Sequence, residues 1–204
     1  MKSSYRFYRG CFRIARVLFG VLYGLNVKGA ENLPQGAFLV CANHSSNLDP
    51  LFVAMACGIE NHMHIIAKAE LYRIPILSAV IKKLGAIRVD REIADMNTIK
   101  ETLNYLKNGE KVAIFPEGTR NSEKGVISAK SGAAKIAERA NVPIVPIYIP
   151  RNKPLFHKIH IVIGEAYTVG KPAARRAPEE YMLIVDDIMD KIEALNPHLC
   201  TNNL

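Results

Sequence analysis

The chain has 204 residues, of which 49% are hydrophobic and 23% charged, a composition that is typical of a folded domain and excludes wholesale disorder. Its formal net charge of +8 favours anionic partners, such as nucleic acid, phospholipid headgroups or phosphorylated substrates. No run approaches the roughly 20 apolar residues of a membrane-spanning helix, and the four cysteines form no CxxC pair, which favours a reducing compartment.

Residues 4–24 have the pattern of a basic amphipathic helix. Four arginines recur at spacings of three and four and would form one narrow stripe: Arg6, Arg9, Arg13 and Arg16. The opposite side carries Phe7, Cys11, Ile14, Leu18 and Leu22, flanked by Tyr8, Phe12 and Phe19. Such a helix would lie in a membrane interface, or would dock on the protein's own core, and both interpretations stay open. The arginines also interrupt the apolar run, so we expect no signal peptide.

After residue 26 the pattern changes to short apolar runs separated by helical segments, which is typical of a mostly parallel mixed sheet flanked by helices. The candidate strands cover 37–42, 64–68, 86–89, 111–115, 143–149 and 158–164. The clearest helices cover about 95–107 and 178–195. We therefore expect a single α/β domain over residues 27–204, preceded by the amphipathic helix over residues 1–26.

Polar segments follow four of these strands, at the point where each strand ends. They are NHSSNLD after the first strand, AKAEL after the second, VDR after the third and PEGTR after the fourth. Ligands of such sheets gather at the carboxyl ends of the strands. These four segments are therefore the first place to look for a site.

His44 and Asp49 lie in the first of these segments. Asp49 followed by Pro50 is typical of a helix start, with the aspartate as N-cap and the proline at the first helical position. Asp49 can also accept a hydrogen bond from one imidazole nitrogen, because a carboxylate has two oxygens. The other nitrogen of His44 would then be free to take a proton. The pair suits a general base, and since no GxSxG motif accompanies it, we expect the activated nucleophile to arrive with the substrate.

The segment FPEGTRNSEKG (115–125) is a candidate phosphate-binding turn. Pro116 and Gly118 would expose backbone donors, and Arg120 adds a planar guanidinium suited to phosphate. A surface turn with a solvated arginine is the alternative. Without a P-loop or GxGxxG pattern we expect no nucleotide cradle. His62 and His64 flank Met63 without further ligands, so we expect no metal.

Four ordered segments resemble the motifs of the lysophosphatidic acid acyltransferases, the bacterial PlsC-like glycerolipid acyltransferases. They are NHSSNLD (43–49), which matches the family's NHx4D motif, GAIRVDR (85–91), FPEGTR (115–120) and VPIVPIYI (142–149). The similarity covers most of the chain, from residue 27 to about residue 165. It implies a glycerol-3-phosphate acyltransferase-like fold and an enzyme that moves a fatty acyl group from acyl-CoA or acyl-ACP to a lysophospholipid hydroxyl. The acceptor implied first is 1-acyl-glycerol-3-phosphate, which gives phosphatidic acid.

The resemblance also implies a mechanism and site residues. His44, oriented by Asp49, would deprotonate the acceptor hydroxyl, which attacks the donor thioester without an acyl-enzyme. The residues implied to bind the glycerol phosphate are Lys68, Arg91, Glu117, Gly118, Thr119 and Arg120. No metal and no resident cofactor is implied, since the acyl donor is a co-substrate.

Alternatives remain at this point. The chain could acylate another lyso-acceptor, or it could be a catalytically silent peripheral lipid-binding protein that keeps the phosphate pocket and the basic helix. We expect no nucleic-acid binding, because the arginines lie on a helix with a broad apolar face and no RNP, KH or zinc-finger pattern accompanies them. The expected partners are a lysophospholipid, acyl-CoA or acyl carrier protein, and a membrane surface. The expected location is peripheral, on the cytoplasmic face of a membrane.

Overall fold

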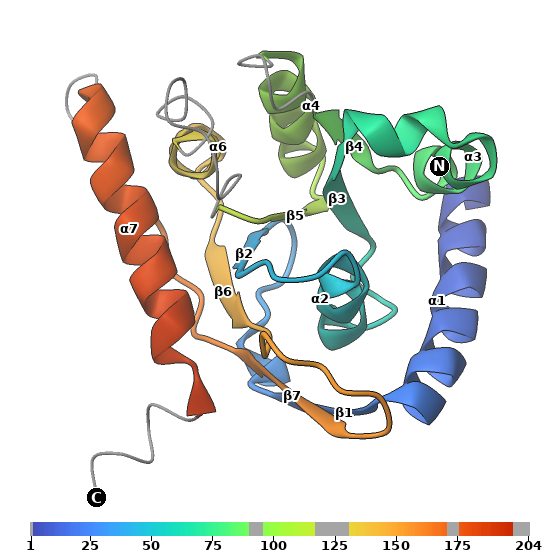
Figure 1. Cartoon of the computed structure of the whole chain (residues 1–204). Helices are drawn as coiled ribbons and strands as arrows, with labels where there is room; N and C mark the ends of the chain where they lie inside the picture. Colours follow the sequence, from blue (N-terminus) through green and yellow to red (C-terminus); the bar gives the residue numbers. More distant parts are fainter. Residues whose placement is uncertain (1, 90–95, 117–130, 171–175, 198–204) are drawn as a thin grey trace, which may run out of the picture.

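A computed structural model describes residues 2–89, 96–116, 131–170 and 176–197 (Figure 1). The helices are α1 (Lys2–Leu22), α2 (Asp49–Cys57), α3 (Pro75–Lys83), α4 (Met96–Lys107), α6 (Gly132–Ala140) and α7 (Pro178–Ala194), with short 3-10 helices η1 (Ala30–Asn32) and η2 (Ala69–Arg73). The strands are β1 (Gly24–Lys28), β2 (Leu39–Ala42), β3 (Met63–Lys68), β4 (Ile87–Val89), β5 (Lys111–Ile114), β6 (Ile144–Tyr148) and β7 (Lys158–Ile163).

The seven strands form one sheet in the order β1-β7-β6-β2-β5-β3-β4. All neighbouring pairs are parallel except β6 and β7. The predicted single α/β domain with a mostly parallel mixed sheet is therefore confirmed, as are the six predicted strands. The sequence did not predict β1, which pairs with β7, because its few apolar residues directly follow the helical pattern of α1.

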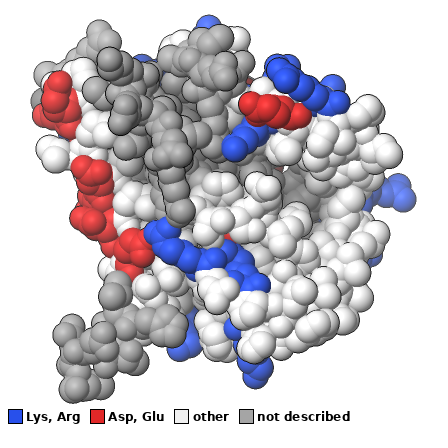
Figure 2. Space-filling view, viewed as in Figure 1, with Lys and Arg blue, Asp and Glu red and all other residues white. Residues whose placement is uncertain are grey.

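Five strands run in the same direction, so their carboxyl ends meet at one edge of the sheet. These are β2, β3, β4, β5 and β6, and β7 starts from the same edge after residues 149–157. The four strands that the predicted polar segments follow therefore end at this edge. Figure 2 shows lysine and arginine side chains gathered near the middle of one face, where the segment after β6 runs in Figure 1.

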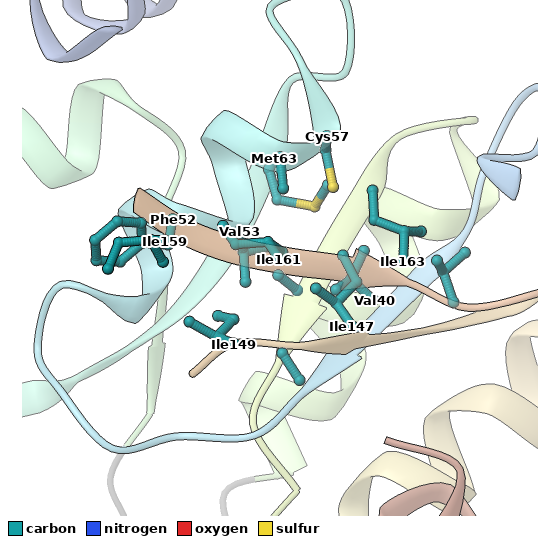
Figure 3. Packing of buried hydrophobic residues seen from close by; sticks show 14 of the residues in the cluster. Val40, Phe52, Val53, Cys57, Met63, Ile147, Ile149, Ile159, Ile161 and Ile163 are labelled. Atoms are coloured by element: carbon teal, nitrogen blue, oxygen red, sulfur yellow. The ribbon is translucent and has the colours of Figure 1, made fainter. Parts of the chain in front are cut away.

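Helices cover both faces of the sheet, because its central strands are apolar on both sides. Along β2, Val40 and Ala42 pack with α1 and α2, whereas Leu39 and Cys41 pack with α4, α6 and α7. Figure 3 shows the first of these cores, where side chains from α2 lie over those of the sheet. Its labelled members are Val40, Phe52, Val53, Cys57, Met63, Ile147, Ile149, Ile159, Ile161 and Ile163.

Helix α1 docks on this core through an aromatic stripe. The buried members are Tyr8, Phe12 and Phe19, and Tyr23, directly after the helix, is buried beside them. The rings of Phe19 and Tyr23 lie 5.0 and 5.3 Å from that of Phe52 on α2. Large aromatic side chains bury the most apolar area per residue, which explains why the residues expected to flank the apolar face form the docking face.

A second apolar row on α1 faces solvent. Ile14, Val17, Leu18 and Val21 are between 54% and 69% exposed. Core docking therefore accounts for only one side of this helix. Across the described ranges, no helix combines the length and mean hydropathy that crossing a bilayer requires. The boundary between a helical segment (1–26) and a domain (27–204) stays a prediction.

Gly29 provides a test of the packing between β1 and β7. Its φ is +77°, and a Cβ there would lie 2.0 Å from the carbonyl oxygen of Ile163. Gly36 has a similar φ of +80°, but no neighbouring atom lies within 4 Å of its Cβ position. We expect Gly36→Ala to lower the free energy of unfolding by about 1–2 kcal/mol and Gly29→Ala by about 1–3 kcal/mol more, because overpacking is added to strain.

Urea unfolding followed by circular dichroism measures both losses. Equal losses of stability in the two variants would mean that the Ile163 carbonyl moves away from the added methyl group without any cost in stability.

Candidate active site

The segment between β2 and α2 holds His44 against Asp49. His44 Nδ1 lies 3.1 Å from Asp49 Oδ2, so the expected contact between the two side chains is present. The imidazole is 25% exposed, whereas the carboxylate is fully buried. A partly exposed imidazole is thus held by a carboxylate that water does not reach.

Asp49 is not the N-cap that the sequence predicted. Helix α2 begins at Asp49, with Leu48 in the N-cap position. Asp49 Oδ2 instead accepts hydrogen bonds from the backbone N–H groups of Ser45 and Ser46, both at 2.6 Å. These amides precede the helix, so the carboxylate fixes the shape of the segment that carries His44.

The carboxyl group of Asp49 is held in its ionised form. Burial alone would raise its pKa, but hydrogen bonds from His44, from the amides of Ser45 and Ser46 and from Lys153 outweigh burial and lower the pKa below its ordinary value. Because the folded-state pKa is depressed, this stabilisation is present above the ordinary pKa and is lost as the pH falls through the folded-state pKa. At neutral pH Asp49 is therefore an anion.

Asn43 joins the end of β2 to the end of β6. Its Nδ2 donates to the carbonyl oxygen of Ile149 at 2.7 Å, and its Oδ1 accepts from the N–H of Ile149 at 2.8 Å. The Asn43 side chain is fully buried. This reciprocal pair continues the pairing of β2 and β6 beyond the strands and places the segment after β6 beside His44.

Lys153 lies in that segment, and the sequence did not predict it as a site residue. Its Nζ lies 3.0 Å from Asp49 Oδ1 and donates to Ser45 Oγ at 2.7 Å. The four polar segments that the sequence indicated as a site follow the first four predicted strands, and none of them contains Lys153. Applying the same rule to the fifth strand would have found it, since PRNK follows that strand directly.

The end of β5 packs on the catalytic histidine candidate. The rings of Phe115 and His44 lie 4.5 Å apart at an interplanar angle of 30°. Phe115 opens the FPEGTR segment, so this contact places the start of the predicted phosphate-binding turn beside the imidazole. Lys68 ends β3 at the same edge of the sheet, with an exposed side chain.

The other residues predicted to bind phosphate or glycerol lie outside the described residues. They are Arg91, Glu117, Gly118, Thr119 and Arg120. Their roles stay predictions, as does that of Lys68.

His62 and His64 have a different environment from a metal site. His62 Nε2 lies 2.9 Å from the carbonyl oxygen of Leu84, and His64 Nδ1 lies 2.8 Å from that of Gly85. Burial lowers the pKa of His64. These rings bind backbone carbonyls, and within the described part of the chain no group of three or more His, Cys, Asp or Glu side chains could hold a metal ion.

Comparison with known proteins gives one consistent family. The family model described as Acyltransferase matches residues 24–150. A 1-acyl-sn-glycerol-3-phosphate acyltransferase of Bacillus subtilis (strain 168) is 31% identical over 199 residues, which cover 94% of this chain and 98% of the relative. One of Borreliella burgdorferi is 27% identical over 208 residues, covering 95% of this chain and 81% of the relative.

A solved structure agrees with these relatives. The crystal structure of the 1-acyl-sn-glycerophosphate (LPA) acyltransferase PlsC from Thermotoga maritima matches with a TM-score of 0.62 and 28% identity, over 96% of this chain and 79% of that chain. Fold, motif order and sequence similarity therefore agree. The chain belongs to the acyltransferase family, in its PlsC-like group.

Proposed function

We propose that the protein transfers a fatty acyl group from a thioester donor to the free hydroxyl of 1-acyl-glycerol-3-phosphate, which gives phosphatidic acid. The observation that carries the proposal is the partly exposed His44 held by the buried carboxylate of Asp49. The names of the relatives support the acceptor, since they are 1-acyl-sn-glycerol-3-phosphate acyltransferases. Both acyl-CoA and acyl-ACP carry the thioester that this chemistry requires.

In the proposed mechanism His44 acts as general base. Because Nδ1 faces Asp49, Nε2 is the nitrogen that takes the proton of the acceptor hydroxyl. The hydroxyl oxygen attacks the thioester carbonyl, a new ester bond forms, and the carbon–sulfur bond breaks. The leaving thiolate then takes the proton from the imidazolium, which Asp49 has stabilised meanwhile.

The mechanism uses no acyl-enzyme. Of the described cysteines, Cys41 and Cys57 are buried free thiols, and burial raises the pKa of Cys57 to about 12. A thiol of this kind is neither ionised nor accessible. The side chain that would bind phosphate most directly is Arg120, with Lys68, Arg91, Glu117, Gly118 and Thr119 around it, as the family motifs imply.

We propose further that the protein works as a peripheral enzyme on the cytoplasmic face of a membrane. We define its outer apolar strip as Ile14, Val17, Leu18 and Val21 of α1 with Leu155 and Phe156. The two parts of the strip meet at the end of α1, where the N–H of Phe156 donates to the carbonyl oxygen of Leu22 at 2.6 Å. Arg13 and Arg16 are exposed on the same helix, which suits an anionic lipid surface.

Two further observations support this location. Phe156 is 75% exposed although its φ is +62°, a conformation that is costly for a bulky side chain. An exposed aromatic ring held in a strained backbone conformation is consistent with a contact between this ring and the membrane. Cys11, Cys41 and Cys57 are free thiols, which supports a reducing compartment.

Replacement of the proposed base gives the first test of the chemistry. We expect His44→Ala to lower kcat by about 10²–10⁴-fold. The fold should stay intact, because Asp49 keeps its two amide donors and Lys153. His160→Ala, at an exposed histidine of β7, is the matched control and should have wild-type activity. Full activity of His44→Ala, with an unchanged melting temperature, would overturn the mechanism.

The acceptor and donor are tested together with the purified protein. We expect acylation of 1-acyl-glycerol-3-phosphate to exceed that of lysophospholipids with a capped phosphate, because the predicted arginines and lysine recognise a free phosphate dianion. It should also exceed that of glycerol 3-phosphate, which has the same dianion but lacks the acyl chain of the acceptor named for the relatives. Each acceptor is incubated with acyl-CoA and with acyl-ACP, and products are identified by mass spectrometry. Preference for another acceptor would correct the substrate, whereas lipid binding without any product would favour a silent lipid-binding protein.

The outer apolar strip is tested by Phe156→Gly. Glycine removes the ring and also relieves the left-handed backbone strain, so we expect unchanged or slightly higher thermal stability. Binding to vesicles that contain anionic lipid should weaken about 10- to 150-fold, since burying such a ring contributes roughly 1.5–3 kcal/mol. Leu183→Ser, at a 68% exposed leucine of α7, is the matched control on the opposite face of the sheet and should bind normally.

Sedimentation of both variants with vesicles, beside duplex DNA at the same salt, measures this effect. Wild-type vesicle binding by Phe156→Gly would exclude the 155–156 turn from the contact. Preference of the wild-type protein for DNA would revive the nucleic-acid interpretation.

A further inference from the structure

Lys153 is a buried cation that the proposed mechanism does not use. Its side chain is only 6% exposed, and its Nζ lies 3.0 Å from Asp49 Oδ1. The ammonium also donates to Ser45 Oγ at 2.7 Å and to the carbonyl oxygen of Arg151 at 3.4 Å. Lysine is rarely buried without a charged partner, because removing an ammonium from water is costly. The fold therefore places this charge at Asp49.

The two oxygens of Asp49 have different partners. Oδ2 faces His44 and the backbone N–H groups of Ser45 and Ser46. Oδ1 is fully buried and meets no hydrogen-bond criterion with any described residue, but it forms an ion pair with the ammonium of Lys153 at 3.0 Å. Lys153 thus holds the carboxylate from the side opposite the imidazole.

Few other charges surround the pair in the described part of the chain. Arg151, in the same segment, is paired with Glu193 of α7, between Arg151 Nη2 and Glu193 Oε1. Directly after β5, the uncharged ring of Phe115 contacts the ring of His44. At the end of β3, Lys68 is exposed. Lys153 is consequently the cation in direct contact with the carboxylate that orients His44.

We propose that Lys153 is a positioning residue, which fixes Asp49 in place and offsets its negative charge so that His44 can release the proton it takes. The proposal rests on the acyl transfer proposed above. Lys153 lies outside the four segments that resemble the family's motifs. A bare buried carboxylate would stabilise the imidazolium strongly. The imidazole would then keep its proton instead of passing it to the leaving thiolate, and catalysis is fastest when the base has a proton affinity matched to the working pH.

The kinetic test compares three variants of the full chain. Lys153→Met removes the charge and keeps an apolar stem, Lys153→Arg keeps the charge, and Lys158→Met, at an exposed lysine of β7, is the matched control. For Lys153→Met we expect kcat to fall about tenfold with an unchanged KM for 1-acyl-glycerol-3-phosphate. The acid limb of its pH profile should move about one pH unit upward, because a cation that opposed protonation is gone. Lys153→Arg should restore the acid limb, and Lys158→Met should match the wild type.

Two kinetic outcomes would overturn the proposal. One is an acid limb that stays in place while kcat falls, which would mean a structural role alone. The other is a raised KM for the acceptor with unchanged kcat, which would mean that Lys153 binds substrate instead of Asp49.

The titration of His44 in the resting protein gives a readout that does not depend on activity. NMR of histidine-labelled protein, with the His44 signal assigned from His44→Ala, should show a midpoint about one pH unit higher in Lys153→Met than in the wild type. Equal midpoints overturn the role of Lys153. If the midpoint shifts but the wild-type protein acylates no acceptor, the proposed function is wrong, whereas the effect of Lys153 on His44 is supported.

Ser45→Ala covers the case in which Lys153→Met does not fold. This variant removes the hydroxyl that accepts from Lys153 but keeps the backbone N–H on Asp49. We expect a smaller upward shift of the His44 midpoint, and an unshifted midpoint would count against the proposal.

Discussion

A carboxylate without access to water must be supplied with hydrogen-bond donors and positive charge by the protein, and the site depends on how Asp49 meets this requirement. Two donors are amides of its own segment, one partner is the His44 ring, and the last is Lys153 from beyond β6. Satisfying the buried anion therefore shapes the β2–α2 segment, orients the imidazole and ties two strand ends together. Loss of the amide donors or of the Lys153 ammonium would leave part of the charge uncompensated, which is far more costly inside a protein than at its surface.

Much of the architecture could be predicted from the sequence because strands buried on both faces are apolar at nearly every position. β2 and β6 stand out for this reason, and their polar ends identify the edge where ligands gather. β1 could not be predicted, since it is short, half-buried and continuous with a helical pattern. Periodicity also could not decide which of the two apolar rows of α1 meets the core, because that choice depends on the shape of the surface around Phe52.

The site was predictable to the extent that it is local. His44 and Asp49 are close in sequence, and a short segment can bring an imidazole to a carboxylate. The N-cap prediction was wrong because the carboxylate finds amides that precede the helix, a choice made by the fold of the segment and not by its composition. The local pattern after β6 could identify Lys153 as a candidate but not its contact with Asp49. That contact depends on β6 lying beside β2, and strand order is a property of the whole sheet.

The stretch from Ile149 to Phe156 connects the His44–Asp49 pair with the outer apolar strip. Ile149, at one end, is hydrogen-bonded to Asn43, and Lys153, in the middle, forms an ion pair with Asp49. Phe156, at the other end, is hydrogen-bonded to the last turn of α1. Because these three contacts lie along so short a stretch, they keep the His44 imidazole at a fixed distance from the outer apolar strip. If the strip rests on lipid, the imidazole stands at a set height above the bilayer, and an acceptor hydroxyl is within range only when its own acyl tail holds it at that height.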